Sequence, residues 1–422
     1  MPRQLAADWL TSYVKYVEPC VESPEQWVWW SSLTALAASL KRHVWINRGS
    51  YKIFPNIYTC LVGAPGLGKG QAIMPVLSLL REANTANIMT DNITMQYVLE
   101  ALSNGFQTPV ITPSNSPGAS PAMPSIPSGV GGNIAFSKES ACIVVADEFS
   151  IFIHDPNYDL PNLNKLWDGG EGAVSYGTRG KGMFEITNPC QTLLAGSAPE
   201  YLVRCVPQSA VGGGFTRRVN FVYSQTQGKR KPWPQLNAKV GNDIVEDLRH
   251  IAGLRGEFKF DPLARNLFEK IHTDSKPQEY DDEALSTYRT SMWAHSAKIA
   301  MNLSASRDDS LVIHKCDLEL AKDRIDSIIV DIPRVFRATG DSDMAAAADK
   351  VLKFVEIKGF ASFEDILHAN YRHVSKQDLS VIIETLVAGK IIQESSQGGK
   401  QLFMVVPQQQ QQRAQRVAQI NP

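Results

Sequence analysis

Apolar residues recur along the chain at two different periods, which separate predicted helices from predicted strands. Apolar positions at helical spacing run through residues 5–42, and similar patterns return at 71–84 and 94–104. The same spacing dominates from residue 242 to residue 338. The chain is therefore expected to be rich in amphipathic helices, with one long helical region in its second half.

Short apolar runs between these helices predict buried strands. Such runs occupy residues 57–63, 141–150 and 191–199, and residues 43–49 alternate in the manner of a half-buried strand. Strands that are apolar on both faces are typical of parallel sheets covered by helices. The order of strands and helices therefore favours an α/β fold built on a parallel sheet.

Two further segments interrupt this pattern. Residues 174–187 read VSYGTRGKGMFEIT and predict a β-hairpin with Gly180, Lys181 and Gly182 at its tip. Residues 108–132 are rich in Pro, Ser and Gly, a composition that does not build a core. We expect this stretch to be a surface loop inserted between two core elements.

The pattern changes again after residue 340. Residues 345–406 predict three helices followed by a strand pair with a turn at Gly398 and Gly399, the order found in winged-helix domains. Such domains bind duplex DNA or contact other proteins. The five consecutive glutamines at 408–412 predict a disordered tail.

Composition and charge narrow the class of protein. The 422 residues are 43% hydrophobic and 20% charged, with a formal net charge of −1, which predicts a soluble chain of two or three domains. A strongly basic total would have indicated nucleic acid directly, and this total does not. The six cysteines are scattered without metal-ligand spacing, so we expect a reducing, cytoplasmic setting and no structural zinc. The most apolar helix, 27–40, is too short to span a bilayer, and the N-terminus lacks the apolar core of a signal peptide.

Residues 63–71 read GAPGLGKGQ, with the G-x-x-x-x-G-K spacing of a phosphate-binding P-loop. A predicted strand precedes this stretch and a predicted helix follows it, as the motif requires. Backbone N–H groups and the helix N-terminus would hold phosphate oxygens, and Lys69 would reach the β- and γ-phosphates of ATP. The predicted nucleotide-binding residues are Gly63, Ala64, Pro65, Gly66, Leu67, Gly68, Lys69, Gly70 and Gln71.

Gly70 departs from the usual motif, in which a Ser or Thr hydroxyl at this position holds Mg²⁺. The stretch resembles the loop of adenylate kinases, G-x-P-G-x-G-K-G-T, so a glycine here is compatible with a working site. Mg²⁺ would then be held through water and phosphate oxygens. The same resemblance keeps a nucleotide kinase open as an alternative, and a binding protein with a vestigial ATP site is a further one.

A partner motif lies about eighty residues downstream. Residues 143–148 read IVVADE, an apolar strand that ends in two acids, which is the Walker B pattern. Asp147 would hold Mg²⁺, and Glu148 would orient and deprotonate the attacking water. The pair of motifs predicts ATP hydrolysis.

The order of P-loop, IVVADE, hairpin, TLLAGS at 192–197 and GGGFTRR at 212–218 resembles an AAA+ ATPase of the helicase branch. It is most similar to helicase-like ATPases of phages, prophages and plasmids, and more distantly to superfamily 3 and minichromosome-maintenance helicases. The likeness covers roughly residues 5–340. It implies an AAA+ P-loop core (51–235) and a helical lid (236–340) after an N-terminal helical segment (1–50). The patterns beyond this likeness add a winged-helix domain (341–406) and a Gln-rich tail (407–422).

The resemblance also implies roles for single residues. Ser197 would be sensor 1, a polar contact to the γ-phosphate or the attacking water. Arg217 or Arg218 would be the arginine finger that reaches the ATP of a neighbouring subunit, and Arg217 is favoured. Arg289 would be sensor 2, supplied by the lid.

In superfamily 3 helicases, the hairpin before sensor 1 lines a central pore and grips DNA with a basic residue. Lys181, with Arg179 beside it, would have that role here. A second basic run, GKRKPWP at 228–234, is either a contact to nucleic acid or a solvated linker.

We therefore expect an Mg²⁺- and ATP-dependent motor that forms a homo-oligomeric ring, with a hexamer as the favoured form, on single-stranded DNA. It would be a replicative helicase of a phage or mobile element in a prokaryotic cytoplasm, without a membrane partner. The main alternative is a non-translocating AAA+ helicase loader or initiator. A replication initiator or a primase is the expected protein partner.

Overall fold

The computed structural model describes residues 3–109, 136–170, 173–178, 182–212, 214–234, 237–278, 283–340, 343–370, 374–397 and 400–406. Some predicted features lie outside these residues: the hairpin residues Arg179 and Lys181, nearly all of the 108–132 insert, the Gly398–Gly399 turn and the Gln-rich tail. The chain divides into two compact units, residues 1–336 and 337–422, each with an apolar core of its own.

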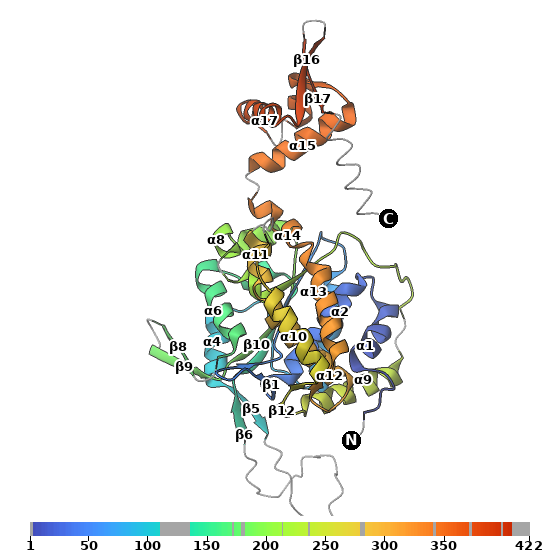
Figure 1. Ribbon diagram of the computed structural model, residues 1–422, viewed down its shortest axis with the longest axis vertical. Coiled ribbons are helices and arrows are strands. Elements are labelled where there is room, and N and C mark those ends of the chain that lie inside the picture. Colours follow the sequence, from blue (N-terminus) through green and yellow to red (C-terminus); the bar gives the residue numbers. More distant parts are fainter. Residues whose placement is uncertain are drawn as a thin grey trace, which may run out of the picture. The chain divides into compact units, whose positions relative to one another are not determined.

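A five-stranded, all-parallel sheet forms the centre of the first unit (Figure 1). Its order is β11–β3–β10–β7–β4. The predicted strands at 57–63, 141–150 and 191–199 become its three central members, β3, β7 and β10, in which every residue is buried. The strand predicted at 141–150 ends earlier, at Ala146, because residues 149–152 form the short helix α5. The expected parallel α/β sheet is therefore confirmed. The strands are β11 (Val219–Tyr223), β3 (Tyr58–Val62), β10 (Cys190–Ser197), β7 (Ala141–Ala146) and β4 (Ile88–Thr90).

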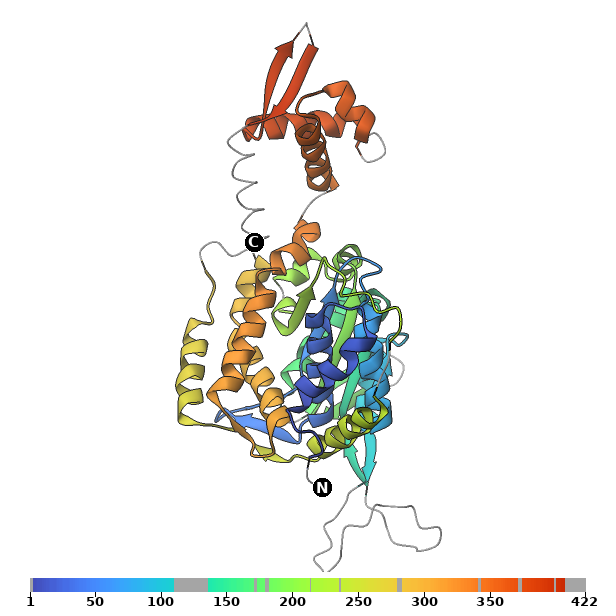
Figure 2. The ribbon, with the colours of Figure 1, turned by 90° about the vertical axis from the view of Figure 1, so that its right-hand side faces the viewer.

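Helices cover both faces of this sheet (Figures 1 and 2). The most apolar of them, α2 (Glu25–Leu40), is buried along nearly its whole length, with Trp27 and Trp30 at 0% exposure. It contacts β3, β10 and β11 of the sheet and several neighbouring helices. A helix apolar on all sides must be covered on all sides, which explains its place in the core. The other helices are α1 (Trp9–Val17), α3 (Lys69–Ala83), α4 (Met95–Asn104), α5 (Phe149–Phe152), α6 (Pro156–Asp168), α7 (Pro199–Cys205) and α8 (Gln208–Val211).

Two antiparallel hairpins project from the sheet (Figure 1). The predicted hairpin is present as β8 (Ala173–Thr178) and β9 (Gly182–Thr187), paired from Ala173 with Thr187 to Thr178 with Gly182. The second hairpin, β5 (Phe106–Pro109) with β6 (Phe136–Glu139), frames most of the predicted insert.

The helical region after the sheet shares the core of the first unit and is not a separate body. Its strand β12 (Gly256–Glu257) pairs in parallel with β1 (Val44–Asn47), which itself pairs with β2 (Lys52–Ile53). The short strands β13 (Lys259–Phe260) and β14 (Val312–Ile313) pair with each other. The helices are α9 (Ala238–Ala252), α10 (Pro262–Asp274), α11 (Glu283–Arg289), α12 (Met292–Arg307), α13 (Lys315–Ile329) and α14 (Ile332–Gly340).

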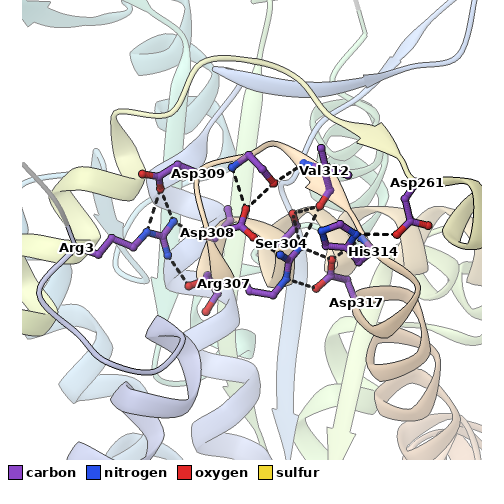
Figure 3. Close-up of polar contacts among 12 residues, drawn as sticks. Arg3, Asp261, Ser304, Arg307, Asp308, Asp309, Val312, His314 and Asp317 are labelled. Carbon is purple, nitrogen blue, oxygen red and sulfur yellow. Dashed lines mark hydrogen bonds and ion pairs between the residues drawn. The ribbon is translucent and has the colours of Figure 1, made fainter.

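A polar network fixes the turn between α12 and α13 (Figure 3). Arg3 donates through Nε to Asp309 Oδ1 at 3.0 Å, which ties the N-terminal arm to this turn. Arg307 Nη2 lies 2.9 Å from Asp317 Oδ2, and the same carboxylate accepts the backbone N–H of His314 at 2.7 Å. These contacts join segments from both ends of the unit.

The second unit follows the predicted order of three helices and a strand pair. A three-stranded antiparallel sheet, in the order β15–β17–β16, packs with the helices around a small apolar core. Phe336 ends the first unit, and its ring packs edge-on against Phe221 of β11, with centroids 4.9 Å apart. The elements are α15 (Asp343–Lys358), β15 (Ala361–Ser362), α16 (Phe363–Asn370), α17 (Lys376–Ala388), β16 (Ile392–Gln397) and β17 (Lys400–Val405). Within the described part of the chain, no helix has the length and apolar character needed to cross a membrane.

Candidate active site

The P-loop sequence forms the turn between β3 and α3. Gly66 and Gly68 have φ values of +86° and +90°, a region that residues with a Cβ rarely occupy. These two residues let the chain curl around the start of α3, whose first-turn N–H groups lack partners within the helix. The loop thus aims a helix N-terminus and its partial positive charge at one point, as phosphate binding requires.

Lys69 is the first residue of α3. Its Nζ donates to Gly63 O at 2.7 Å and approaches Ala64 O at 3.2 Å, so the amine lies against the carbonyls of its own loop. Partial burial lowers the pKa of Lys69, and the nearby carboxylate of Glu148 opposes this shift. A phosphate oxygen would be a stronger, charge-assisted partner for this amine.

The Walker B carboxylates lie beside the P-loop. Asp147 is exposed and Glu148 is half-buried, directly after the end of β7. The carboxyl ends of parallel strands meet at one edge of a sheet, where α/β proteins bind ligands. Together these segments line a hollow of about 510 Å³. The lining residues are Gly66, Gly68, Lys69, Gly70, Gln71, Asp147 and Glu148.

Ser197 lies between the two motifs. It ends β10, which pairs with β3 on one side and β7 on the other, and it stands in register with Val62. Its buried hydroxyl donates to Glu148 Oε1 at 2.8 Å. The structure thus brings Lys69, Glu148 and Ser197 to one edge and gives Ser197 a specific contact, which holds the carboxylate in place.

Gly70 approaches the other carboxylate. A Cβ built on Gly70 would lie 3.1 Å from Asp147 Oδ1, closer than ordinary van der Waals contact. The start of α3 is thus packed directly against Asp147. The described residues contain no cluster of three or more metal-binding side chains. Mg²⁺ commonly rests on one or two carboxylates plus water and substrate phosphates, so the residues present fit that ion.

One acidic residue of this edge was missed by the sequence analysis. Asp91 directly follows β4, and its Oδ2 accepts the backbone N–H of Asp147 at 3.2 Å. β4 has only three residues, too few to show an apolar period, so neither the strand nor the acid after it stands out. Asp91 orients the Walker B turn.

The two candidate arginines have different environments. Arg218 is 7% exposed, and it donates to both carboxylate oxygens of Asp168 at 3.1 and 2.7 Å and to Gly214 O at 2.7 Å. The guanidinium is buried and held bidentately by a carboxylate of its own chain, which is structural in character. Arg217 is half-exposed and lines a separate hollow of about 480 Å³ with Asp168 and Trp293.

Arg217 lies at the opposite end of the sheet from its own P-loop. It belongs to the 3₁₀ turn η2 (Thr216–Arg218), directly before β11, and β11 runs parallel to β3 from Val219 beside Tyr58. The five residues of β3 separate the two ends by roughly 16 Å at about 3.3 Å per residue. α11, which ends at Arg289, packs against η2. The structure therefore places neither Arg217 nor Arg289 at the P-loop of the same chain.

A residue of the helical region fixes the backbone at Arg217. His295 of α12 lies 2.8 Å through Nε2 from Arg217 O, and its ring stacks on Tyr288 with centroids 4.9 Å apart. Burial lowers the pKa of His295 to about 4, so the neutral ring donates its Nε2 proton to that carbonyl. Lys298, one turn further, is also buried and donates to Phe54 O at 3.0 Å.

The segment before α2 contacts the P-loop, which the sequence analysis also missed. Ser23 donates from Oγ to Gly68 O at 2.6 Å, and Glu22 N–H donates to Gln71 Oε1 at 2.7 Å. Ser23 also lines a hollow of about 520 Å³. Apolar and basic side chains share this hollow, among them Val14, Val28, Trp29, Lys229, Lys231 and Arg324.

No protein-family model matches the chain, and no curated protein matches it in sequence. The class of protein is therefore described by its fold and by the residues of its candidate site. It is a mixed α/β protein with a five-stranded parallel sheet. At the carboxyl edge of this sheet, a P-loop sequence, two consecutive acids and a buried serine lie together.

Proposed function

We propose that this protein is an Mg²⁺-dependent ATPase of the AAA+ class that works as a ring-forming helicase on single-stranded DNA. The observation that carries the proposal is the convergence of Lys69, Asp147, Glu148 and Ser197 at the carboxyl edge of the parallel sheet. These residues come from three strand ends and supply one cation, two acids and one hydroxyl. This is the set that phosphoryl transfer to water uses.

Each residue has a role in this proposal. The glycine-rich turn and Lys69 hold the β- and γ-phosphates of ATP. Asp147 holds Mg²⁺ together with water, and the ion supplies neutralisation of phosphate charge when bound. Glu148 orients the attacking water and accepts its proton, and Ser197 keeps that carboxylate in position.

The position of Arg217 favours an assembly of several copies. A finger at the far end of the sheet cannot serve the P-loop of its own chain, because a whole strand length separates them. A neighbouring copy in a closed ring would bring its Arg217 to this site, since head-to-tail contacts present opposite ends of adjacent subunits. Arg289 ends the helix that packs against the same turn, so it would lie near the same neighbouring site.

The trans arrangement can be tested by mixing two inactive variants. Glu148→Gln loses the base but keeps an intact finger, and Arg217→Ala loses the finger but keeps an intact P-loop. We expect each alone to hydrolyse ATP at least about 100-fold more slowly than wild type. In a one-to-one mixture, about a quarter of the interfaces would combine an intact P-loop with an intact finger, so activity should return.

Arg218→Ala is the matched control for that experiment. Its guanidinium is paired with Asp168 in the same chain, so its loss should lower thermal stability instead of removing a finger. A mixture of Glu148→Gln and Arg217→Ala that stays as inactive as its components would contradict the trans-finger assignment.

The contact with DNA rests on the resemblance of the β8–β9 hairpin to a pore hairpin, because Lys181 lies outside the described residues. We expect single-stranded DNA to stimulate ATP hydrolysis by wild type, and Lys181→Ala to lose that stimulation. Lys270→Ala, on the exposed face of α10, is the control. Hydrolysis that is indifferent to DNA would favour the loader or initiator. Phosphate transfer from ATP to a nucleoside monophosphate would favour the nucleotide kinase.

A further inference from the structure

The loop between β11 and α9 combines a basic run with an uncovered aromatic ring. Residues 229–234 read KRKPWP, in which Lys229 and Arg230 are exposed and Trp233 is 88% exposed. The chain has eight tryptophans, all within the described residues, and the other seven are buried or half-buried. Trp233 therefore stands apart from every other tryptophan in its surroundings.

The residues beside Trp233 restrict where its ring can go. Pro232 and Pro234 flank it, and proline fixes its own φ and favours an extended conformation in the residue before it. The two prolines thus restrict the backbone on either side of the ring, and the protein leaves the ring 88% exposed. An aromatic side chain normally buries about 150–250 Å² of surface, so this one offers a large contact area that the chain itself leaves uncovered.

The chemistry of the loop favours a polyanion with flat faces. Lysine and arginine side chains bind phosphates, and aromatic rings stack on unpaired bases, which is how sequence-independent sites hold single strands. A duplex keeps its bases stacked internally and would leave the ring without a partner. Three consecutive cations next to the ring also disfavour an apolar protein surface as the partner.

The stem of this loop is anchored to the nucleotide-binding turn. Gly228 N–H donates to Glu22 O at 2.8 Å, and Lys231 N–H donates to Glu22 Oε1 at 2.8 Å. Glu22 in turn donates its backbone N–H to Gln71, the third residue of α3. One residue therefore contacts both the basic loop and the P-loop helix.

We propose that residues 229–233 bind single-stranded nucleic acid, with Trp233 stacked on a base and Lys229 and Arg230 on phosphates, and that Glu22 couples this contact to the P-loop. The site is distinct from the β8–β9 hairpin and needs no pore. The coupling, but not the binding, rests on the proposed ATPase function.

The binding is tested without nucleotide, so that its result does not depend on ATP hydrolysis. Anisotropy of a labelled oligothymidylate would be measured with wild type, Trp233→Ala and Trp233→Phe. We expect Trp233→Ala to weaken binding about 5- to 150-fold, the range for removal of one stacked base, and Trp233→Phe to retain most of the affinity. Tyr97→Ala, which removes an aromatic side chain that is 56% exposed on α4, should leave binding unchanged.

The phosphate contacts have a separate signature. Replacing Lys229 and Arg230 by glutamine should reduce the dependence of log K on log salt by about 0.7 for each phosphate that the protein then leaves unneutralised. The matched control replaces Lys270 and Lys276, which are exposed on and after α10, and should leave that slope unchanged. An affinity for duplex DNA equal to that for the single strand would overturn the stacking assignment.

The coupling has its own variant. A non-hydrolysable ATP analogue should change the affinity of wild type for the oligonucleotide. Glu22→Ala removes the side-chain acceptor of the Lys231 N–H, so it should keep the binding but lose that change. Equal affinity of Trp233→Ala and wild type would overturn the proposal. So would unchanged affinity with a loss of self-association in sedimentation, which would make the loop an interface between copies. Absent ATP hydrolysis with intact, Trp233-dependent binding would instead reject only the proposed ATPase.

Discussion

Two serine hydroxyls, those of Ser197 and Ser150, lie near the carboxylate of Glu148, the proposed base. Ser197 Oγ donates to Glu148 Oε1 at 2.8 Å, whereas Ser150 Oγ lies at a weaker 3.3 Å from the same oxygen. Ser197 is also fully buried. Its contact is therefore shorter and comes from a buried hydroxyl, which makes it the stronger constraint on the carboxylate.

Ser197→Ala should lower kcat about 10- to 100-fold, because Glu148 would lose the donor that orients it for proton transfer. Steady-state hydrolysis at saturating ATP measures this change. Ser150→Ala is the matched control and should have a smaller effect. A kcat that Ser197→Ala leaves at the wild-type value would show that the hydroxyl does not position the base.

Gly70 gives a second prediction at this scale. A Cβ there would lie 3.1 Å from Asp147 Oδ1, so a serine would bring its hydroxyl beside the proposed metal-binding acid. We expect Gly70→Ser to lower the Mg²⁺ concentration needed for half-maximal nucleotide binding, because a hydroxyl can replace one water on the ion.

Gly70→Ala is the control for this substitution, since it adds the same Cβ without the oxygen. It should lower stability by about 1 kcal/mol, because crowding against Asp147 is partly offset by the higher helix propensity of alanine, and it should not improve Mg²⁺ binding. Identical Mg²⁺ titrations of the serine and alanine variants would mean that the site does not use a hydroxyl at this position.

At the scale of elements, α12 connects the helical region to the turn that carries Arg217. His295 makes this connection through a single hydrogen bond to a backbone carbonyl, and Lys298 anchors the same helix at Phe54, before β3. The loop that offers the proposed finger is thus held by a helix distant from it in the chain. The backbone at Arg217 is therefore fixed by this contact, although the Arg217 side chain is half-exposed.

The buried imidazole predicts a pH dependence of stability. Burial lowers the pKa of His295 to about 4 in the folded chain, below its ordinary value of 6.5 in the unfolded chain. Between these values the unfolded state binds more protons, so stability falls as the pH drops from about 6.5 toward 4. The loss attributable to this residue should be on the order of 2–3 kcal/mol.

Urea unfolding at about pH 7 and about pH 5 covers the upper part of that interval and should detect about 2 kcal/mol of this loss. His295→Gln keeps a donor for Arg217 O but cannot titrate, so its stability should fall less than that of wild type over this interval. An equal fall in both proteins would show that the ring is not kept neutral by its surroundings.

The protein has two apolar cores, one in each unit, and the candidate active site belongs to only one of these units. The last side chains packed into the core of the first unit include Ile332, Val335 and Phe336, and the second core is built from side chains between Ala347 and Val405. Every residue of the candidate active site lies in the first unit.

A chain ending at Gly340 should therefore fold and bind a fluorescent ATP analogue with unchanged affinity. Its main thermal transition should match that of the full chain, since α14 still covers Phe221. Differential scanning calorimetry and fluorescence titration measure these properties. Aggregation of the shorter chain, or a loss of nucleotide affinity, would show that the second unit supports the first.

Local patterns in the sequence were sufficient for much of this architecture. The strands that became β3, β7 and β10 are short, largely apolar runs without a polar face, so burial on both faces could be predicted from the residues alone. The hairpin at 174–187 and the order of elements after residue 340 were also predicted and are present. The short β4 carries no such signal, and Asp91 was missed with it.

The sequence by itself determined that a P-loop and a carboxylate pair exist, because each motif is a contiguous stretch whose chemistry depends on its own residues. It did not determine which arginine is committed to an ion pair, since Asp168 lies fifty positions from Arg218 in the chain. Only the tertiary structure placed Arg217 at the far end of the sheet and joined Glu22 to Gln71. Those relations arise from strand order and from contacts between distant segments, which the packing of the whole core decides.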